Sequence, residues 1–147
     1  MKNKNLILTL FFATIICSIS CEKTSRCSDY PDSCGKIEIN RKECLVMCGE
    51  PKEPSLNSYV KLTIYNHTKQ DMVWENAYCL QYFNGTDWIL LNSDMIFTDI
   101  GYILKPDKTA ETKIPVSGEH TIGKYRVIKN IGNQYGSYNL YFEFEIK

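Results

Sequence analysis

The chain has 147 residues, which is enough for one domain with a buried core and too few for two. Its 17 lysine and arginine residues balance 17 aspartate and glutamate residues, so the protein lacks the basic surface that nucleic-acid binding requires, and we expect no nucleic-acid partner. Aromatic residues make up 12% of the chain, and the strand-like segments are rich in Val, Ile, Thr and Tyr, a bias that favours an all-β fold.

The first 20 residues have the features of an export signal. Lys2 and Lys4 precede an apolar run over residues 6–16, which is too short and too interrupted by threonine for a membrane span. We therefore expect residues 1–20 to be a cleaved signal peptide and the protein to leave the cytoplasm.

A cysteine follows this segment directly. Ser18-Ile19-Ser20-Cys21 resembles the lipobox of bacterial lipoproteins, in which a small residue precedes a cysteine that is lipidated and becomes the first residue of the mature chain. Ser20 fits this pattern, whereas the family usually has an aliphatic residue at the position of Ser18. The resemblance implies lipidation of Cys21 and a membrane-anchored location in the bacterial cell envelope, with residues 21–35 as a tether and cysteine-containing segment.

Two alternatives stay open. The lipidated residue could instead be Cys17, although a bulky isoleucine precedes it. Ordinary cleavage after Ser20 would release a free secreted domain, because Ser-x-Ser also suits a signal peptidase.

The chain beyond Cys21 contains five candidate disulfide cysteines: Cys27, Cys34, Cys44, Cys48 and Cys79. Four of them are close together near the mature N-terminus, which is typical of a disulfide staple in an oxidising compartment, and all three pairings among them remain open. Cys79 is expected either as the unpaired thiol or as a partner that ties the N-terminal segment to the domain. Zinc is the rival interpretation, but the spacings lack the close Cys-x2-Cys pairs of structural zinc sites, so we expect no metal.

The globular domain is expected over residues 36–147. Residues 36–40 alternate as a first edge strand, and the glycine and two prolines within residues 49–54 predict that a loop follows. A second strand is predicted over residues 59–65, where alternate residues face the core.

A hairpin is the strongest local signal. Asn84-Gly85 joins the strand-like residues 78–83 and 88–91, and this dipeptide accepts the positive φ values of a tight turn. Trp88 is expected in the core.

The last third of the chain completes the predicted strands. Residues 92–108 are expected to form a crossing loop with short β pieces, in which Leu104 fills the core. Strands are predicted over residues 109–115, 123–131 and 138–146. In the last of these, four alternate residues face the core: Leu140, Phe142, Phe144 and Ile146. About seven short strands with no helical period predict an antiparallel β-sandwich.

A series of short motifs occurs in a distinctive order: Tyr65-Asn66-x-Thr68, Tyr78-x-Leu80, Asn84-Gly85-x-x-Trp88, the segment from Phe97 to Pro106, Gly123-x-Tyr125-Arg126-Val127 and Phe142-x-Phe144-x-Ile146. Their order and spacing resemble the bacterial immunoglobulin-like domains of small secreted lipoproteins. The resemblance implies an Ig-like sandwich in which Tyr125 forms a tyrosine corner, with its ring buried and its hydroxyl bonded to backbone near the preceding turn. Val127 stands where antibody domains have their second cysteine, so no disulfide between the sheets is expected. The resemblance implies no catalytic residue, and we expect no cofactor.

Catalytic and metal-binding residues are not marked by the sequence. His67 and His120 both adjoin turn residues, and no Ser-His-Asp or Cys-His arrangement accompanies them. A hydrolytic role would require a histidine beside the strand cysteine or a serine. Asp94, Asp99 and Asp107 lack the close spacing of a calcium loop and are interpreted as exposed turn acids.

Six tyrosines could form a flat recognition patch for a protein or a glycan: Tyr59, Tyr65, Tyr102, Tyr135, Tyr138 and Tyr141. Ordinary strand-face positions are the favoured alternative. Asn66-His67-Thr68 and Asn84-Gly85-Thr86 match the glycosylation sequon, but we interpret both as turn residues.

The sequence therefore predicts a non-enzymatic, lipid-anchored Ig-like domain that acts as a binding or structural module of the bacterial cell envelope. Its partners would be the membrane, through the N-terminal lipid, and an unknown protein or glycan. The alternative is an inhibitor or immunity-type protein that blocks an enzyme through its aromatic face or its cysteine-rich segment.

Overall fold

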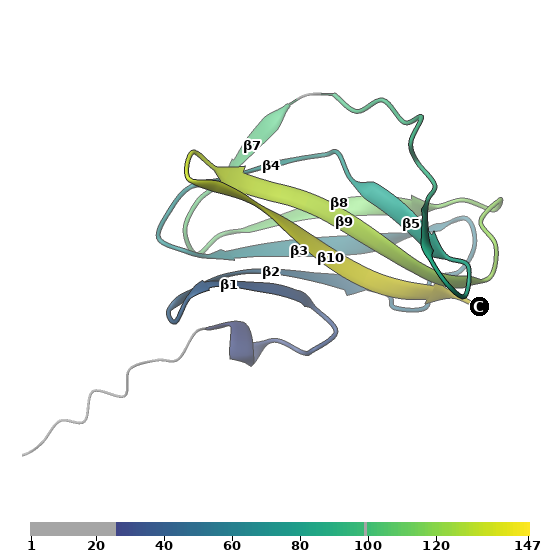
Figure 1. Ribbon diagram of the computed structural model, residues 1–147, viewed down its shortest axis with the longest axis horizontal. Coiled ribbons are helices and arrows are strands. Elements are labelled where there is room, and N and C mark those ends of the chain that lie inside the picture. Colours follow the sequence, from purple (N-terminus) through teal and green to yellow (C-terminus); the bar gives the residue numbers. More distant parts are fainter. Residues whose placement is uncertain (1–25, 99) are drawn as a thin grey trace, which may run out of the picture.

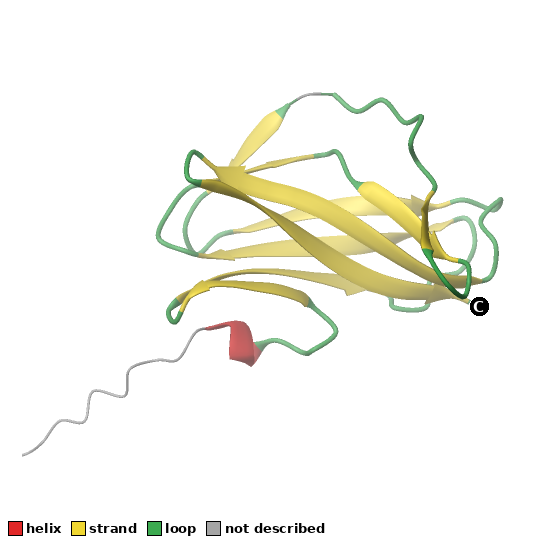
Figure 2. Ribbon diagram, in the orientation of Figure 1, coloured by secondary structure: helices red, strands yellow, loops and turns green. Residues whose placement is uncertain are grey.

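The computed structural model describes residues 26–98 and 100–147. They form ten strands in two antiparallel sheets, preceded by one turn of 3-10 helix, η1 (Arg26–Asp29) (Figures 1 and 2). The four-stranded sheet has the order β1-β2-β3-β8: β1 (Gly35–Asn40), β2 (Glu43–Glu50), β3 (Ser58–His67) and β8 (Thr109–Val116). The six-stranded sheet has the order β6-β5-β9-β4-β7, with β10 also beside β9: β4 (Met72–Glu75), β5 (Cys79–Phe83), β6 (Trp88–Leu90), β7 (Gly101–Leu104), β9 (Gly123–Asn133) and β10 (Gly136–Ile146).

The predicted signal peptide, residues 1–20, and the predicted lipidation site Cys21 lie outside the described residues, as does Asp99. Within the described ranges, no helix is long and apolar enough to cross a membrane.

The two sheets pack face to face around one core. On β3, Val60, Leu62 and Ile64 are fully buried, as the alternation of that segment predicted. On β10, every second residue from Leu140 to Ile146 is buried as well, and these two inner faces belong to the same hydrophobic cluster. The all-β sandwich is therefore confirmed, because the apolar faces of both sheets are covered by each other.

The prediction that a loop follows β1 was wrong in part, because β2 occupies residues 43–50 and the loop begins at Pro51. Its residues from Cys44 to Met47 are all buried, so the strand lacks the alternation expected of a surface strand. One side of β2 faces the core and the other is covered by the N-terminal segment. Gly49 is accommodated in the strand because it has no side chain: a Cβ at this position would clash with the ring of Phe142, at 2.5 Å. The prolines follow the last residue of the strand.

The described residues form ten strands, whereas the sequence predicted about seven. The three additional strands are β2, β4 and β7. β7 and the buried Leu104 lie where short β pieces and a core leucine were expected. β4 and β5 lie end to end along one side of β9, because Trp74 pairs with Ile131 and Cys79 with Ile128. They are thus one long strand interrupted at residues 76–78. On its other side, β7 pairs with the β4 half and β6 pairs with the β5 half.

Tyr125 connects the core to a turn. Its side chain is 1% exposed, and its hydroxyl donates a 2.6 Å hydrogen bond to the carbonyl of Thr121. The ring stacks on that of Phe144 at 5.4 Å. This is the arrangement that the family resemblance implied for a tyrosine corner. Val127, two residues further along β9, is fully buried on the same face.

Candidate functional site

The N-terminal segment is fastened to the outer side of β2 by two disulfides, Cys27–Cys44 and Cys34–Cys48. Cys44 and Cys48 alternate with the core residues of β2, so both face away from the sandwich interior. Val46 lies between them and is fully buried beneath the segment. The four clustered cysteines therefore form a disulfide staple and not a zinc site.

Cys79 lies on the other sheet. It is exposed on β5 and is the free thiol among the described residues. Of the two roles expected for it, the structure places it in neither disulfide, so it does not tie the N-terminal segment to the sandwich.

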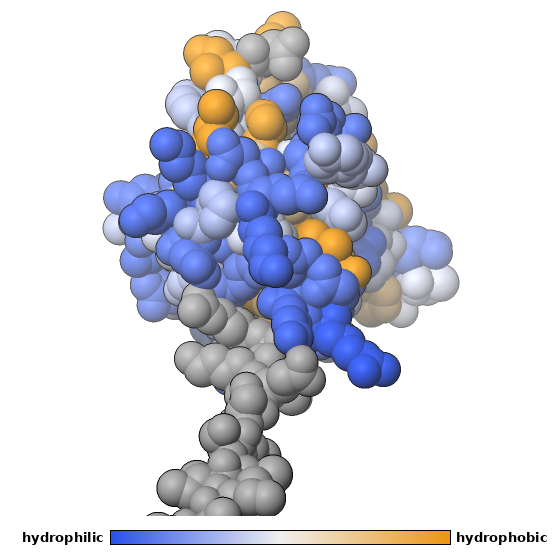
Figure 3. Space-filling model, turned by 90° about the vertical axis from the view of Figure 1, so that its left-hand side faces the viewer, coloured by the Kyte–Doolittle hydropathy of each residue, from blue (hydrophilic) through white to orange (hydrophobic). Residues whose placement is uncertain are grey.

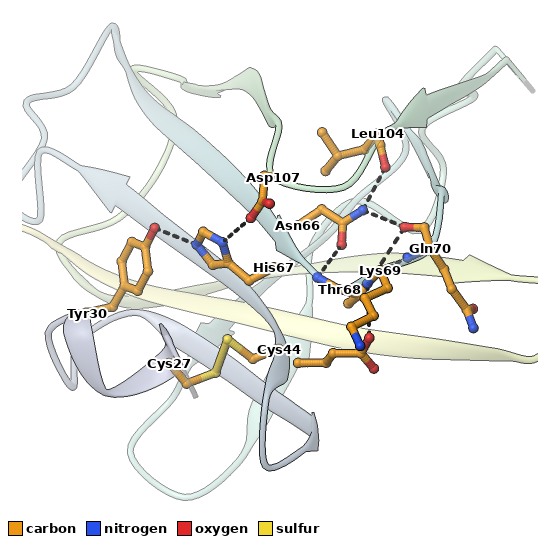
Figure 4. A network of polar contacts seen from close by, with 11 residues as sticks. Cys27, Tyr30, Cys44, Asn66, His67, Thr68, Lys69, Gln70, Leu104 and Asp107 are labelled. Carbon is orange, nitrogen blue, oxygen red and sulfur yellow. Dashed lines mark hydrogen bonds and ion pairs between the residues drawn. A yellow bond between two sulfur atoms is a disulfide. The ribbon is translucent and has the colours of Figure 1, made fainter. Parts of the chain in front are cut away.

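A polar network joins the stapled segment to β3 and to the turn before β8. His67 Nε2 lies 2.8 Å from the Tyr30 hydroxyl, and Nδ1 lies 3.6 Å from a carboxylate oxygen of Asp107. Figure 4 shows the imidazole between these two side chains, near the Cys27–Cys44 disulfide. Tyr30 also packs on Tyr65, with ring centroids 4.8 Å apart. These contacts orient the stapled segment on the sheet.

Asn66 organises the neighbouring turn from within. It is fully buried, and its amide donates 2.8 Å hydrogen bonds to the carbonyls of Gln70 and Leu104 (Figure 4). Its side-chain oxygen accepts a hydrogen bond from the Thr68 amide. The first sequon asparagine is thus part of the turn. In the second, the Asn84 side chain accepts two backbone hydrogen bonds within the β5–β6 turn.

Both histidines take part in contacts that connect neighbouring segments of the fold. His67 contacts Tyr30 and Asp107, as described above. The ring nitrogen Nδ1 of His120 accepts a hydrogen bond from the backbone amide of Ser117, and burial lowers the pKa of His120. Among the residues described, no three metal-binding side chains gather at one point.

The six candidate tyrosines do not form one patch. Tyr59 and Tyr65 lie on the outer face of the four-stranded sheet, whereas Tyr141 lies on the outer face of the other. Tyr102 packs against Trp74, and the remaining two are in the β9–β10 turn or against the core.

A shallow polar hollow lies over β2, β3 and β8 on the four-stranded sheet. Lys61 forms ion pairs there with Glu50 at 3.0 Å and Glu111 at 3.6 Å. The hydrogen bond that Lys61 donates to Glu50 raises the pKa of Lys61 above its ordinary value. The charges of this hollow are therefore already paired.

Exposed apolar side chains gather at the β7 side of the molecule. Val73 and Ile103 face each other across β4 and β7 on the outer face, and Ile103 is 65% exposed. Figure 3 shows hydrophobic surface at the top of the molecule, where β7 lies, above a largely hydrophilic end. Apolar surface of this kind is characteristic of interaction sites.

A second surface feature, which we call the Trp88 cluster, consists of four half-buried residues on the outer face of the six-stranded sheet: Gln81, Phe83, Trp88 and Arg126. The guanidinium carbon of Arg126 lies 4.3 Å from the centre of the Trp88 ring. Arg126 Nε and Nη2 donate to the side-chain oxygen of Gln81 at 2.8 and 2.6 Å. Phe83 flanks the indole at 5.2 Å.

The prediction that Trp88 is a core residue was wrong. It is half-buried and lies outside the sandwich, because Phe83 and Trp88 pair across the hairpin on the face opposite Tyr82, which packs on the core. Sequence reasoning also missed Arg126 and Gln81. The only signal for them was the alternation, which places both on the outer face; their proximity depends on the pairing of β5 with β9.

A lysine lies on the inner face. Lys129 alternates with Val127 and Ile131 on β9 and is fully buried. Its ammonium group donates to the carbonyl of Glu75, at the interruption between β4 and β5, and lies 5.2 Å from the Trp74 ring centre. Burial lowers the pKa of Lys129 to about 8, against a smaller opposing effect of the Glu75 charge. The interruption thus leaves a carbonyl that a buried amine satisfies.

The two facing antiparallel sheets, the tyrosine corner and the interrupted strand beside β9 define an Ig-like β-sandwich. A model of the family described as bacterial Ig-like domain matches residues 44–145, more than half of the chain. The protein belongs to this bacterial Ig-like domain family. A search of curated proteins found no match. The family suggests a non-enzymatic binding or structural module, and with the disulfides it suggests an extracytoplasmic location.

Proposed function

We propose that this protein is a lipid-anchored binding module of the bacterial cell envelope, which holds its ligand on the outer face of the six-stranded sheet. The observation that carries the proposal is the Trp88 cluster, in which a half-buried tryptophan and a half-buried arginine contact each other on the outer face of the sheet. Tryptophan and arginine are the residues that contribute most often to binding energy at protein interfaces.

The anchor is supported by the sequence around Cys21 and by the staple. Disulfides persist in oxidising compartments, so a domain with two of them suits a place outside the cytoplasm. Cys21 precedes the first disulfide cysteine, Cys27, by six residues, a span of at most about 20 Å. A lipid on Cys21 would therefore hold the domain close to the membrane surface.

The position of the staple also favours the six-stranded face as the binding surface. The chain enters the domain at η1, beside β1 and β2, and β10 is the strand of the six-stranded sheet that contacts them (Figure 1). β9 and β5 follow β10 in that sheet, so the Trp88 cluster lies away from the entry point. An anchored domain would leave the cluster accessible to a partner.

Membrane fractionation of cells tests the anchor. We expect the wild-type chain in the membrane fraction and the Cys21→Ala variant in the soluble envelope fraction. Cys17→Ala is the matched control and should stay with the membrane. A Cys21→Ala variant that remains in the membrane fraction would refute lipidation at this residue. Intact mass before and after reduction reports the lipid and the two disulfides together.

An inhibitor or immunity-type role would use the other side of the molecule, where Tyr30, Tyr65 and His67 pack together beside the staple. A pull-down from envelope extract separates the two functions. A stoichiometric enzyme that is lost on substitution of Tyr30 would favour the inhibitor, whereas a partner lost on substitution of Trp88 supports the binding module.

A further inference from the structure

We propose that the Trp88 cluster binds a carboxylate carried by an acidic side chain of a protein partner, next to an apolar side chain of that partner. The inference rests on the proposed function only for the accessibility of this face, and it names the chemistry of the ligand. Its geometric basis is a guanidinium whose position is fixed before any ligand arrives.

Two contacts from different strands hold the guanidinium of Arg126. The guanidinium carbon lies over the Trp88 ring on β6, and Gln81 on β5 accepts two hydrogen bonds through a single oxygen. A long side chain usually loses rotamer freedom when it binds, and that loss weakens binding. Because Arg126 is already oriented, less of this freedom remains to be lost.

The cluster offers donors to a ligand and few acceptors. The side-chain oxygen of Gln81 is occupied by Arg126, which leaves the Gln81 amide nitrogen and the remaining guanidinium N–H groups available. Within residues 26–98 and 100–147, Arg126 forms no ion pair with a carboxylate, although Glu143 on β10 is its cross-strand neighbour. A fixed cation surrounded by donors is complementary to an anionic acceptor.

A carboxylate of a protein fits this surface for two reasons. The planar guanidinium fork matches the two oxygens of a carboxylate. The neighbouring outward side chains of the hairpin are apolar: Phe83 is half-buried, and Leu90, which pairs with Gln81, is 45% exposed. An arginine beside exposed aromatic and aliphatic surface has the composition of a protein interface centre.

Acidic residues of the protein itself that lie near Arg126 compete with an external carboxylate for the guanidinium group. Glu143 lies opposite Arg126, and Glu145 lies opposite Lys124, so β10 provides acids on one side of the cluster. Asp87 precedes Trp88 in the hairpin turn, and neither β5 nor β6 contains an acidic residue. Neutralising Glu143 should therefore strengthen binding of an external carboxylate.

The test is a titration of the isotope-labelled full chain, followed by NMR, with the blocked dipeptide acetyl-leucyl-glutamate amide. Its neutral counterpart, acetyl-leucyl-glutamine amide, is the matched probe. The indole N–H signal of Trp88 and the Nε–H signal of Arg126 should shift saturably with the glutamate peptide only. Trp74, which lies on the inner face, provides an internal reference signal that should not move.

Three variants sharpen the result. Arg126→Gln should weaken the apparent affinity about tenfold or more, the size expected for loss of a charge-assisted contact. Lys124→Gln, which removes an exposed cation two residues away on the same strand, should change it less than about twofold. Glu143→Gln should raise the affinity. Circular dichroism checks that each variant keeps the fold.

Several outcomes would overturn the inference. These are equal shifts with the glutamate and glutamine peptides, no saturable shift at Trp88, or unchanged affinity in Arg126→Gln. D-glucuronate, titrated in parallel, tests the source of the carboxylate: saturable binding of glucuronate without binding of the glutamate peptide would point to an acidic glycan and refute a protein partner. None of these results depends on the lipid, so failure of the anchor in the fractionation experiment is distinguished from failure here.

Discussion

The buried Lys129 makes the stability of this protein depend on pH in an unusual direction. Burial holds the pKa of Lys129 at about 8 in the folded protein, whereas its ordinary value is 10.5. Between these values the unfolded chain binds more protons than the folded one, so the free energy of unfolding rises with pH. At neutral pH the charged ammonium costs about 3 kcal/mol of stability relative to the neutral amine.

The assay is denaturant unfolding of wild type and Lys129→Met at pH 7, 8, 9 and 9.5. The difference in unfolding free energy, wild type minus variant, should increase by about 2 kcal/mol over this range. Methionine also leaves the Glu75 carbonyl without its donor, but that loss is a constant offset and does not alter the slope. Taking the difference removes titrations that both proteins share.

Lys124→Met is the matched control, because it removes an exposed cation from the same strand. Its difference from wild type reports the loss of one positive charge without the burial of Lys129. A wild-type minus Lys129→Met difference that stays flat or falls from pH 7 to pH 9.5 would refute the reasoning.

Three further predictions concern stability. Tyr125→Phe removes the buried hydrogen bond to Thr121 and should lower the unfolding free energy by about 1 to 3 kcal/mol; a melting curve that overlaps the wild type would contradict the corner. Asn66→Ala removes three side-chain hydrogen bonds at a buried position, although the Gln70 carbonyl keeps the Thr68 hydroxyl as a donor, and should cost about 3 kcal/mol, measured by urea unfolding. Replacing Cys34 and Cys48 together by alanine opens a loop of 14 residues and should cost about 3 kcal/mol; under reducing conditions the difference from wild type should shrink.

The strands that sequence predicted well are those with local signals. Residues 59–65 and 140–146 alternate between apolar and polar side chains, and a strand with one covered face must alternate in this way. Asn84-Gly85 marked the β5–β6 hairpin correctly: in the four-residue turn, Gly85 has a φ of 103° and the Asn84 side chain accepts two backbone hydrogen bonds. The family match over residues 44–145 agrees with the resemblance found in these motifs.

The features that the sequence analysis predicted wrongly or missed all depend on contacts with other segments of the chain. β2 is buried on both sides, so it shows a continuous apolar run without alternation, and the segment that covers its outer side is attached by disulfides that spacing cannot assign. β4 is only four residues long and exists because β9 and β7 pair with it. Trp88 was expected in the core, whereas its register in the hairpin places it on the outer face.

By itself, the sequence determined the β class of the protein and the inward faces of its longest strands, because these depend on the alternation of residues near in the chain. The resemblance of its motifs to the family implied the tyrosine corner at Tyr125. Only the tertiary structure decided the cysteine pairing, the strand interrupted beside β9 and the meeting of Arg126 with Gln81 and Trp88. Those features join residues distant in sequence, and strand register, which no local pattern encodes, brings them together.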